Sequence, residues 1–381
     1  MEDGGVSIYV RRLAEALQRA GHEVLLAAGA LAGLPGVEVG ELAAGCVSRH
    51  GRDRLVQEVR QAGVEVVNFH QVDDPELLDA MAPLAATVVS AHGWAGCGPG
   101  YRYYGGVHEC PRAHGVGCVR TMLLRNCKHT RDPRSAWPFY RAAATRLAAL
   151  RRADAAVGYS SEVVAHLRHN TVDRVSHVPL PVEVPDVIPE AAAGPPLVAF
   201  TGRIVRAKGL DVLVRSMRWF DADLEVAGDG WARPSIARLV GELGLTARVR
   251  FRGWVPEDAV AELLRRAHVA AVPSAWPEPF GLVGPQAMAQ ARPVVASATG
   301  GVGDWLEHGR TGLAVEPRDP EQLGRALARI LDDPELGRRM GLAGRERVIE
   351  RFNADAHLRA VLAVYHGAIA HRAPSRAATA R

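Results

Sequence analysis

The sequence predicts an α/β protein built from two doubly wound domains with parallel sheets. Short, nearly all-apolar runs alternate with amphipathic helical stretches along the 381 residues, a rhythm typical of parallel strands covered by helices on both faces. Six prolines and a glycine crowd residues 179–196, where neither a helix nor a central strand can continue. The same rhythm then starts again, and the length also suits two domains.

The first domain is expected at residues 1–185. Its strand-like runs are 22–28, 64–69, 87–91, 155–159 and 174–178, and its helical stretches are 6–20, 75–83, 140–150 and 162–169. A doubly wound domain normally begins with a strand that feeds a glycine turn, but Gly4 and Gly5 stand at the start without one. We therefore predict that the natural start lies upstream by roughly ten residues, since a strand is typically 5–6 residues long.

The second domain is expected at residues 186–353, with strands at 197–201, 224–227, 249–252, 269–272 and 293–296. After an apolar run at 312–315 the pattern is helical to about residue 371. We expect a C-terminal helix at 354–371 that packs back on the first domain. A disordered tail is expected at 372–381, which is basic and rich in small residues.

Lys208 is the most distinctive residue of the second domain. Of the 46 Lys and Arg residues only Lys128 and Lys208 are lysines, and a compact ammonium supplies a point charge where guanidinium supplies a planar fork. Arg203 and Lys208 lie where the strand at 197–201 passes through Gly202 into a helix, and a helix N-terminus with free amides favours an anion. The pattern predicts a diphosphate site; a surface lysine on a solvated turn is the plainer alternative.

Three more glycine turns follow predicted strands in this half. They contain Gly228 and Gly230, then Gly281, which opens a helix, and finally residues 298–301. Four such turns at C-terminal strand ends, where open α/β sheets bind ligands, indicate a ligand site. Glu278 precedes the third turn, and alone it would also suit the N-terminus of a helix.

With these motifs the second half resembles the donor domain of family-4 retaining glycosyltransferases, which have the GT-B fold of two Rossmann-like domains facing across a cleft. The matching segments are Gly202-Arg203, Lys208-Gly209, Gly228-Asp229-Gly230, Pro273 to Ala289 and Thr311-Gly312-Leu313. The first half resembles the acceptor domain less closely, through Gly4-Gly5-Val6, Tyr9, Leu13-Ala14, Gly21 to Val24, His70 and Ser90-Ala91-His92.

The resemblance implies a nucleotide-diphosphate sugar as donor substrate, retention of configuration and no catalytic metal. Arg203 and Lys208 would hold the diphosphate and stabilise it as the leaving group. Glu278 would accept hydrogen bonds from sugar hydroxyls, Gly5 would close over the diphosphate, and His92 would face the reacting sugar. The implied catalytic residues are His92, Arg203, Lys208 and Glu278. The implied donor-binding residues are Gly5, Gly202, Arg203, Lys208, Gly228, Gly230, Glu278, Phe280, Gly281, Leu282, Val283 and Gln286.

Two positions depart from the family pattern. Gln286 stands where the family places a second Glu that is expected to bind the ribose hydroxyls. An uncharged amide makes hydrogen bonds roughly half as strong as those of a carboxylate. Gly93 follows His92 where many relatives carry Asp. Donor affinity or nucleotide preference is therefore expected to differ.

Four cysteines, Cys97, Cys110, Cys118 and Cys127, fall within a Cys- and Arg-rich insert expected at about 94–138. In a cytosolic protein such clustering favours metal binding over disulfides, although no Cys-x-x-Cys pair is present. A structural zinc with His108 or His114 as substitute ligands, unpaired or redox-labile thiols, and disulfides are all open. Some members of the family carry a similar insert, which supports a structural role. Cys46 stands apart and suits a small buried apolar position.

Positive charge gathers between residues 112 and 152, where ten Arg and Lys residues stand against one carboxylate. Such a patch suits an anionic acceptor, an acidic membrane surface or nucleic acid, and equally a solvated arginine face. No apolar run approaches the roughly 20 residues that a membrane span needs, and no secretory signal is present. We expect a cytoplasmic protein, with peripheral contact to the anionic face of the cytoplasmic membrane as an option. Nucleic acid is the least favoured partner.

Two other classes of protein are compatible with these features. One is a nucleotide-sugar epimerase or a phosphorylase on the same fold. The other is a non-enzymatic protein that binds anions or nucleic acid, which leaves the four glycine turns unexplained. A Rossmann dehydrogenase is disfavoured, because no Gly-x-Gly-x-x-Gly follows a strand in the first half. The sequence leaves open the donor sugar, its nucleotide base and the acceptor, which could be a cell-envelope polysaccharide, a lipid-linked glycan or a natural product.

Overall fold

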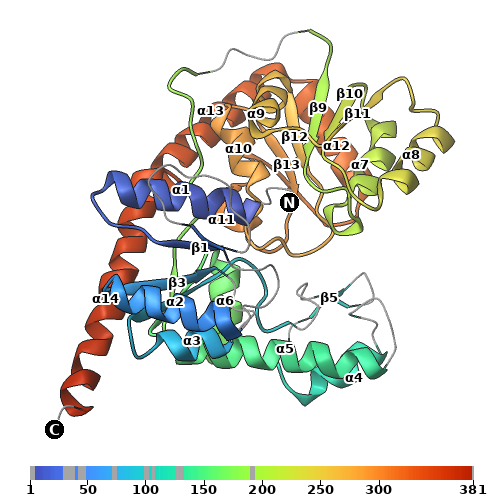
Figure 1. Ribbon diagram of the computed structural model, residues 1–381. Helices are drawn as coiled ribbons and strands as arrows, with labels where there is room; N and C mark the ends of the chain where they lie inside the picture. Colours follow the sequence, from blue (N-terminus) through green and yellow to red (C-terminus); the bar gives the residue numbers. More distant parts are fainter. Residues whose placement is uncertain are drawn as a thin grey trace. The chain divides into compact units, whose positions relative to one another are not determined.

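The computed structural model describes residues 5–28, 39–41, 49–70, 75–97, 103–104, 108–110, 112–124, 127, 133–188 and 194–379. The chain forms two compact units. Unit 1 consists of Met1–Val178 with Asp355–Arg381, and unit 2 consists of Pro179–Ala354 (Figure 1). The change of unit falls at the start of the proline-rich segment. Each unit is an α/β domain with a parallel sheet, which confirms the predicted fold class.

Unit 1 is built on a parallel sheet. Among its described residues this sheet has four strands in the order β3-β4-β7-β8, which are Val66–His70, Ala86–Ala91, Ala155–Gly158 and Val175–His177. Every residue of β4 is buried, which explains its largely apolar sequence. In two further short pairs, β1 (Leu26–Ala28) is parallel to β2 (Val39–Glu41), and β5 (Tyr103–Tyr104) is antiparallel to β6 (His108–Glu109) within the predicted insert.

The helices of unit 1 come from both ends of the chain. They are α1 (Gly5–Arg19), α2 (Arg49–Gln61), α3 (Pro75–Met81), α4 (Val116–Leu124), α5 (Pro133–Arg152), α6 (Ser161–His169) and α14 (Ala354–Thr379). Contacts attach α14 to the rest of unit 1: the Tyr9 hydroxyl lies 3.0 Å from His357 Nε2, and Asn68 Nδ2 donates to the Tyr365 hydroxyl at 2.8 Å. Helix α14 continues to Thr379, so it occupies most of the tail for which the sequence predicts disorder.

Unit 2 is a doubly wound domain. Its described residues form a six-stranded parallel sheet in the order β11-β10-β9-β12-β13-β14. These strands are β9 (Leu197–Thr201), β10 (Asp223–Ala227), β11 (Val249–Gly253), β12 (Val269–Val272), β13 (Val294–Ser297) and β14 (Gly312–Val315). The chain winds outward from β9 in one direction and from β12 in the other. The topological switch point therefore lies between β9 and β12, and ligands of such sheets bind beyond the carboxyl ends of the strands at that point.

Helices cover this sheet, and two of them begin at a side-chain cap. The helices are α7 (Leu210–Ser216), α8 (Arg233–Glu242), α9 (Glu257–Arg266), α10 (Val283–Ala289), α11 (Val302–Trp305), α12 (Pro320–Leu331) and α13 (Pro334–Arg351). The side chains of Asp319 and Asp333 cap α12 and α13, and a proline follows each cap. None of the helices in the described part of the chain combines the length and the apolar character that spanning a membrane requires.

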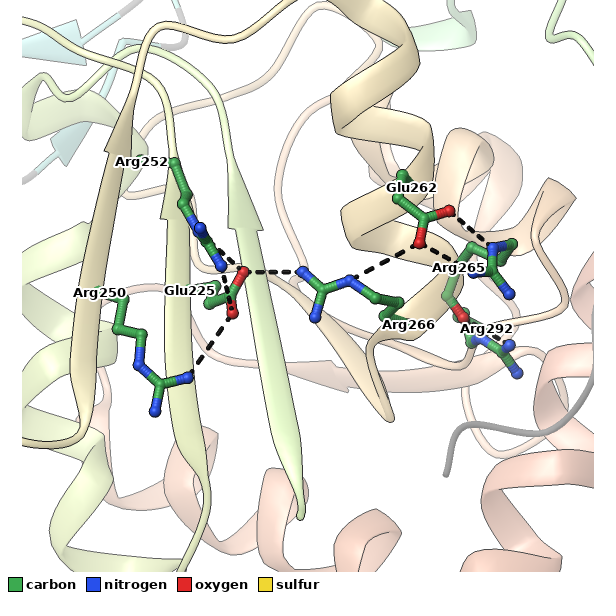
Figure 2. A network of polar contacts seen from close by, with 7 residues as sticks. All are labelled: Glu225, Arg250, Arg252, Glu262, Arg265, Arg266 and Arg292. Atoms are coloured by element: carbon green, nitrogen blue, oxygen red, sulfur yellow. Dashed lines mark hydrogen bonds and ion pairs between the residues drawn. The ribbon is translucent and has the colours of Figure 1, made fainter. Parts of the chain in front are cut away.

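A buried carboxylate organises the edge of the unit 2 sheet. In the edge strand β11, Val249 is buried whereas Arg250 and Arg252 are exposed. Figure 2 shows these arginines and Arg266, at the end of α9, converging on Glu225 of β10. The Glu225 side chain is 3% exposed and lies 3.0 Å from both Arg252 and Arg266. Burial raises the pKa of Glu225, but hydrogen bonds from Arg252 and Arg266 outweigh it and hold the pKa below its ordinary value.

Candidate active site

A tight turn holds Lys208 at the switch point. Residues Arg206–Lys208 form a 3-10 turn after β9, and Gly209 ends that turn with a φ of +67° before α7 begins. A Cβ atom on Gly209 would lie 1.9 Å from the carbonyl oxygen of Pro273, the residue that follows β12. Glycine alone permits this approach, because it has no Cβ and tolerates positive φ. The lysine turn therefore packs directly against the loop after β12.

The loop after β12 brings Glu278 to Lys208. The Glu278 side chain is 4% exposed, and Lys208 Nζ donates to its Oε1 at 2.7 Å. Two further donors reach the same oxygen, Ser274 Oγ at 2.5 Å and Trp276 Nε1 at 3.2 Å. The sequence pattern did not identify the serine or the tryptophan, although both lie in the segment that resembles the family. These partners are all side chains, so the structure does not show Glu278 as the cap of α10.

Other groups suited to an anion lie on the same two loops. Arg203, on the loop of Lys208, is exposed and forms no ion pair with any described residue. Where α10 begins, the N–H groups of Gly281, Leu282 and Val283 donate to no oxygen of the described residues. An unpaired guanidinium and consecutive free amides are the groups with which proteins bind phosphates.

Three predicted donor-binding residues have structural contacts of their own. Phe280 is buried, and its ring centroid lies 5.7 Å from that of Phe352. A Cβ on Gly228 would lie 2.0 Å from the carbonyl oxygen of Gly202, and Gly230 meets the loop after β9 in the same way. The loops after β9 and β10 therefore interlock. Close packing between them requires these glycines, whether or not a ligand approaches. Gln286 is half-buried on α10.

His92 lies in a group of buried and half-buried rings in unit 1. It follows β4, and its Nε2 lies 3.0 Å from Nδ1 of His70, the last residue of β3. Its ring centroid lies 5.5 Å from that of Tyr9 in α1 and 4.7 Å from that of Tyr159 after β7. The ring of His357 in α14 lies 5.5 Å from Tyr9. The predicted Gly5 is the first residue of α1. In the sequence, Tyr9 and His70 stood out only as parts of motifs, and Tyr159 and His357 did not stand out.

Burial keeps Tyr9, His70, His92 and Tyr159 uncharged at neutral pH. It lowers the pKa of His92 to about 4, and burial together with the neighbouring His92 lowers that of His70 to about 3. Burial also raises the pKa of Tyr9 and of Tyr159. Each neutral imidazole carries one N–H, so one histidine of the pair donates to the other. Such an arrangement suits a neutral partner, for example a hydroxyl, better than an anion.

The four cysteines of the insert influence one another but show no metal-ligand arrangement. Cys97, Cys110, Cys118 and Cys127 are free, half-buried thiols. Burial, with the other three thiols nearby, raises the pKa of Cys127 to about 12. Among the described residues, no group of three or more His, Cys, Asp or Glu is arranged to hold a metal ion. The zinc site stays a prediction that metal analysis of the purified protein tests. Cys46 and Lys128 lie outside the described residues.

Comparison with known proteins identifies domains of two related families. Residues 3–184 match the family model Glycosyltransferase Family 4, and residues 186–347 match Glycosyl transferases group 1. The alpha-D-kanosaminyltransferase of Streptomyces kanamyceticus is 34% identical over 150 residues, which are 38% of this chain and 39% of that protein. The alpha-maltose-1-phosphate synthase of Mycolicibacterium smegmatis is 38% identical over 172 residues, which are 42% of this chain and 44% of that protein. The chain thus spans less than half the length of these curated relatives.

Two solved structures are similar over nearly the whole chain. Sucrose-phosphate synthase from Thermosynechococcus elongatus has a TM-score of 0.72 and 26% identity, and the match covers 96% of this chain and 94% of that chain. Anabaena HepE in complex with UDP has a TM-score of 0.68 and 16% identity, and the match covers 95% of this chain and 96% of that chain. The chain therefore has the GT-B fold, with a region that matches the Glycosyltransferase Family 4 model followed by a region that matches the Glycosyl transferases group 1 model.

Proposed function

We propose that this protein is a retaining glycosyltransferase of the hexosyltransferase type, which moves a sugar from a nucleotide-diphosphate sugar to a glycan, a lipid-linked glycan or a natural product. The ion pair between Lys208 and Glu278 at the switch point of unit 2 carries this proposal. It joins a cation, which suits a diphosphate, to a carboxylate, which suits sugar hydroxyls, and a nucleotide-sugar site needs both. The similarity to HepE structures that hold UDP and UDP-glucose supports the choice of donor class.

In the proposed reaction, Lys208 and Arg203 stabilise the departing diphosphate, and the reaction needs no catalytic metal. The bond between the anomeric carbon and the phosphate oxygen breaks, and the acceptor oxygen bonds to that carbon on the same face. The acceptor proton passes to the leaving phosphate. Stabilising the charge that develops on the phosphate is then the main catalytic task of the protein. Glu278 orients the sugar, while the amides of residues 281–283 face the sugar and the phosphate.

His92 is proposed to face the reacting sugar, and Gly5 to approach the diphosphate from unit 1. The neutral state of the histidine pair supports the role of His92. An uncharged imidazole can hydrogen-bond a sugar hydroxyl without competing with Lys208 for the diphosphate. The basic segment 112–152 is proposed to contact an anionic acceptor or the anionic face of the cytoplasmic membrane.

A panel of ligands tests the proposed function. The melting temperature is measured with UDP-, GDP-, ADP- and dTDP-sugars, because a ligand that binds only the folded state raises it. We expect sugars of one nucleotide to stabilise the protein, and transfer from that donor to preserve the anomeric configuration, as read from the proton coupling constants of the product. A product of inverted anomeric configuration would contradict the retaining mechanism. If no nucleotide sugar raises the melting temperature, the proposed function is wrong.

The alternatives lead to other outcomes in the same experiment. An epimerase isomerises the donor without an acceptor, and a phosphorylase releases a sugar phosphate. A non-enzymatic binding protein ignores nucleotide sugars and instead binds DNA or RNA in a salt-dependent manner.

A further inference from the structure

The two oxygens of the Glu278 carboxylate are used unequally. Oε1 accepts hydrogen bonds from Lys208, Ser274 and Trp276. Within the described residues no donor reaches Oε2. A carboxylate oxygen has about two lone-pair sites, so Oε1 is fully occupied while Oε2 keeps its acceptor capacity.

The ammonium of Lys208 is used only in part. Lys has three N–H donors, and among the described residues the Glu278 oxygen is their one acceptor. The Lys208 side chain is 23% exposed, whereas that of Glu278 is 4% exposed. One donor of the ammonium therefore fixes it to the carboxylate, and two remain for a ligand.

We propose that Ser274 and Trp276 are positioning residues for the donor sugar. By holding Oε1, they direct Oε2 toward a sugar hydroxyl. This inference rests on the proposed function. Both residues donate to Glu278, the proposed partner of the sugar, so we expect their effect to be confined to the sugar.

The backbone around these residues is fixed at two points, which gives the side chains a defined direction. Ala275 N donates to Ala207 O on the lysine turn at 2.8 Å, and Gly301 N donates to Glu278 O at 2.8 Å. Ser274 is 1% exposed, so its hydroxyl cannot donate to solvent instead of Glu278. The loop thus presents the serine, the indole and the carboxylate as one rigid group.

The experiment compares a nucleotide sugar with its own free nucleoside diphosphate. Calorimetry first measures the affinity of the wild type for glucose and mannose conjugates of UDP, GDP, ADP and dTDP. The affinities of Ser274→Ala and Trp276→Phe for the tightest-binding conjugate and for its free nucleoside diphosphate are then measured. We expect the nucleotide sugar to bind about tenfold more weakly to each variant, because a hydrogen bond to a charged group is lost. The affinity for the free diphosphate should stay unchanged.

Two control variants match these substitutions in chemistry and burial. Ser216→Ala removes a buried hydroxyl that donates to Leu213 O, and Trp219→Phe alters another half-buried indole of unit 2. Both should bind the two ligands as the wild type does. Lys208→Ala should lower the affinity for both ligands, because both contain the diphosphate. This result distinguishes a diphosphate contact from a sugar contact.

The possible outcomes separate this inference from the proposed function. The positioning role is wrong if either variant binds the diphosphate and the nucleotide sugar with equally reduced affinity, or binds both with wild-type affinity. The proposed function stands in either case. If the wild type binds no member of the panel, the proposed function fails and this inference with it. Trp276→Phe provides the answer alone if Ser274→Ala does not fold.

Discussion

In unit 2 the residues beyond the carboxyl ends of β9 and β12 are charged, whereas in unit 1 those at the ends of β3 and β4 are neutral. Lys208 and Glu278 form an ion pair in unit 2, and Arg203 lies exposed on the same loop as the lysine. His70 and His92 of unit 1 are held uncharged by burial. The same end of a parallel sheet therefore carries two kinds of chemistry. Charge suits the diphosphate of a donor, and neutral rings suit hydroxyl groups.

Replacing Lys208 should have the largest effect on the charged region. Lys208→Ala removes a charge-assisted hydrogen bond worth about 1.5–3 kcal/mol, which corresponds to a loss of about ten- to a hundredfold in kcat/KM. Steady-state kinetics with the preferred donor measures it. Arg238→Ala, at an exposed position on α8, serves as the control and should keep wild-type activity. Near-normal turnover of Lys208→Ala would count against the site.

Replacing Gly209 tests whether packing holds the charged region together. Gly209→Ala should cost about 2–3 kcal/mol of unfolding free energy, a large effect for one substitution, because the new Cβ would meet the Pro273 carbonyl at 1.9 Å. Gly244 is a matched control, since its φ of +69° is almost the same and nothing lies within 4 Å of a Cβ there. Gly244→Ala should cost only about 1 kcal/mol for the strained backbone. Equal losses in urea unfolding would show that the close approach is unimportant.

Replacing Glu225 tests a charge that serves the fold alone. Glu225→Ala leaves Arg252 and Arg266 without their buried partner, and we expect a loss of about 1–2 kcal/mol, since the arginines are half exposed and water screens them. Glu262→Ala, in the same network but half exposed (Figure 2), should change stability by less than about 0.5 kcal/mol. A larger effect at Glu262 than at Glu225 would contradict this view of the sheet edge.

The two regions should respond to acid in different pH ranges. The folded-state pKa values of His70 and His92 lie below the ordinary 6.5, so the unfolded chain gains protons first as the pH falls. Unit 1 should then lose on the order of 1–2 kcal/mol between pH 6.5 and 5. The pKa of Glu225 is lowered from 4.5, so its contribution to unit 2 is lost only below that pH.

Urea unfolding at pH 7 and pH 5 measures this difference. The double variant His70→Asn with His92→Gln removes both titrating rings and should reduce the loss at pH 5. An unchanged pH dependence in the double variant would show that other groups cause it. The loss at pH 5 is not the full effect of the shifted pKa values, because a folded-state pKa of about 4 for His92 still leaves part of the shift unexpressed.

The sequence predicted local features better than contacts. The strands at 197–201 and 269–272 agree with β9 and β12, because short apolar runs between glycines and prolines have few other solutions. Lys208 and Glu278 were found by residue type and motif. Ser274 and Trp276 were not, because nothing in their local pattern distinguishes a serine or an indole that donates to a carboxylate from one that faces water.

The sequence by itself determined the α/β class and the glycines that the turns need, since each depends on neighbouring residues. Only the tertiary structure decided which strands are neighbours and which groups share an oxygen. Lys208 and Glu278 are 70 residues apart in sequence, yet their side chains lie 2.7 Å apart. Their meeting depends on the pairing of β9 with β12 and on the contact of Gly209 with Pro273. Contacts of this kind arise from the packing of whole elements, which no short segment encodes.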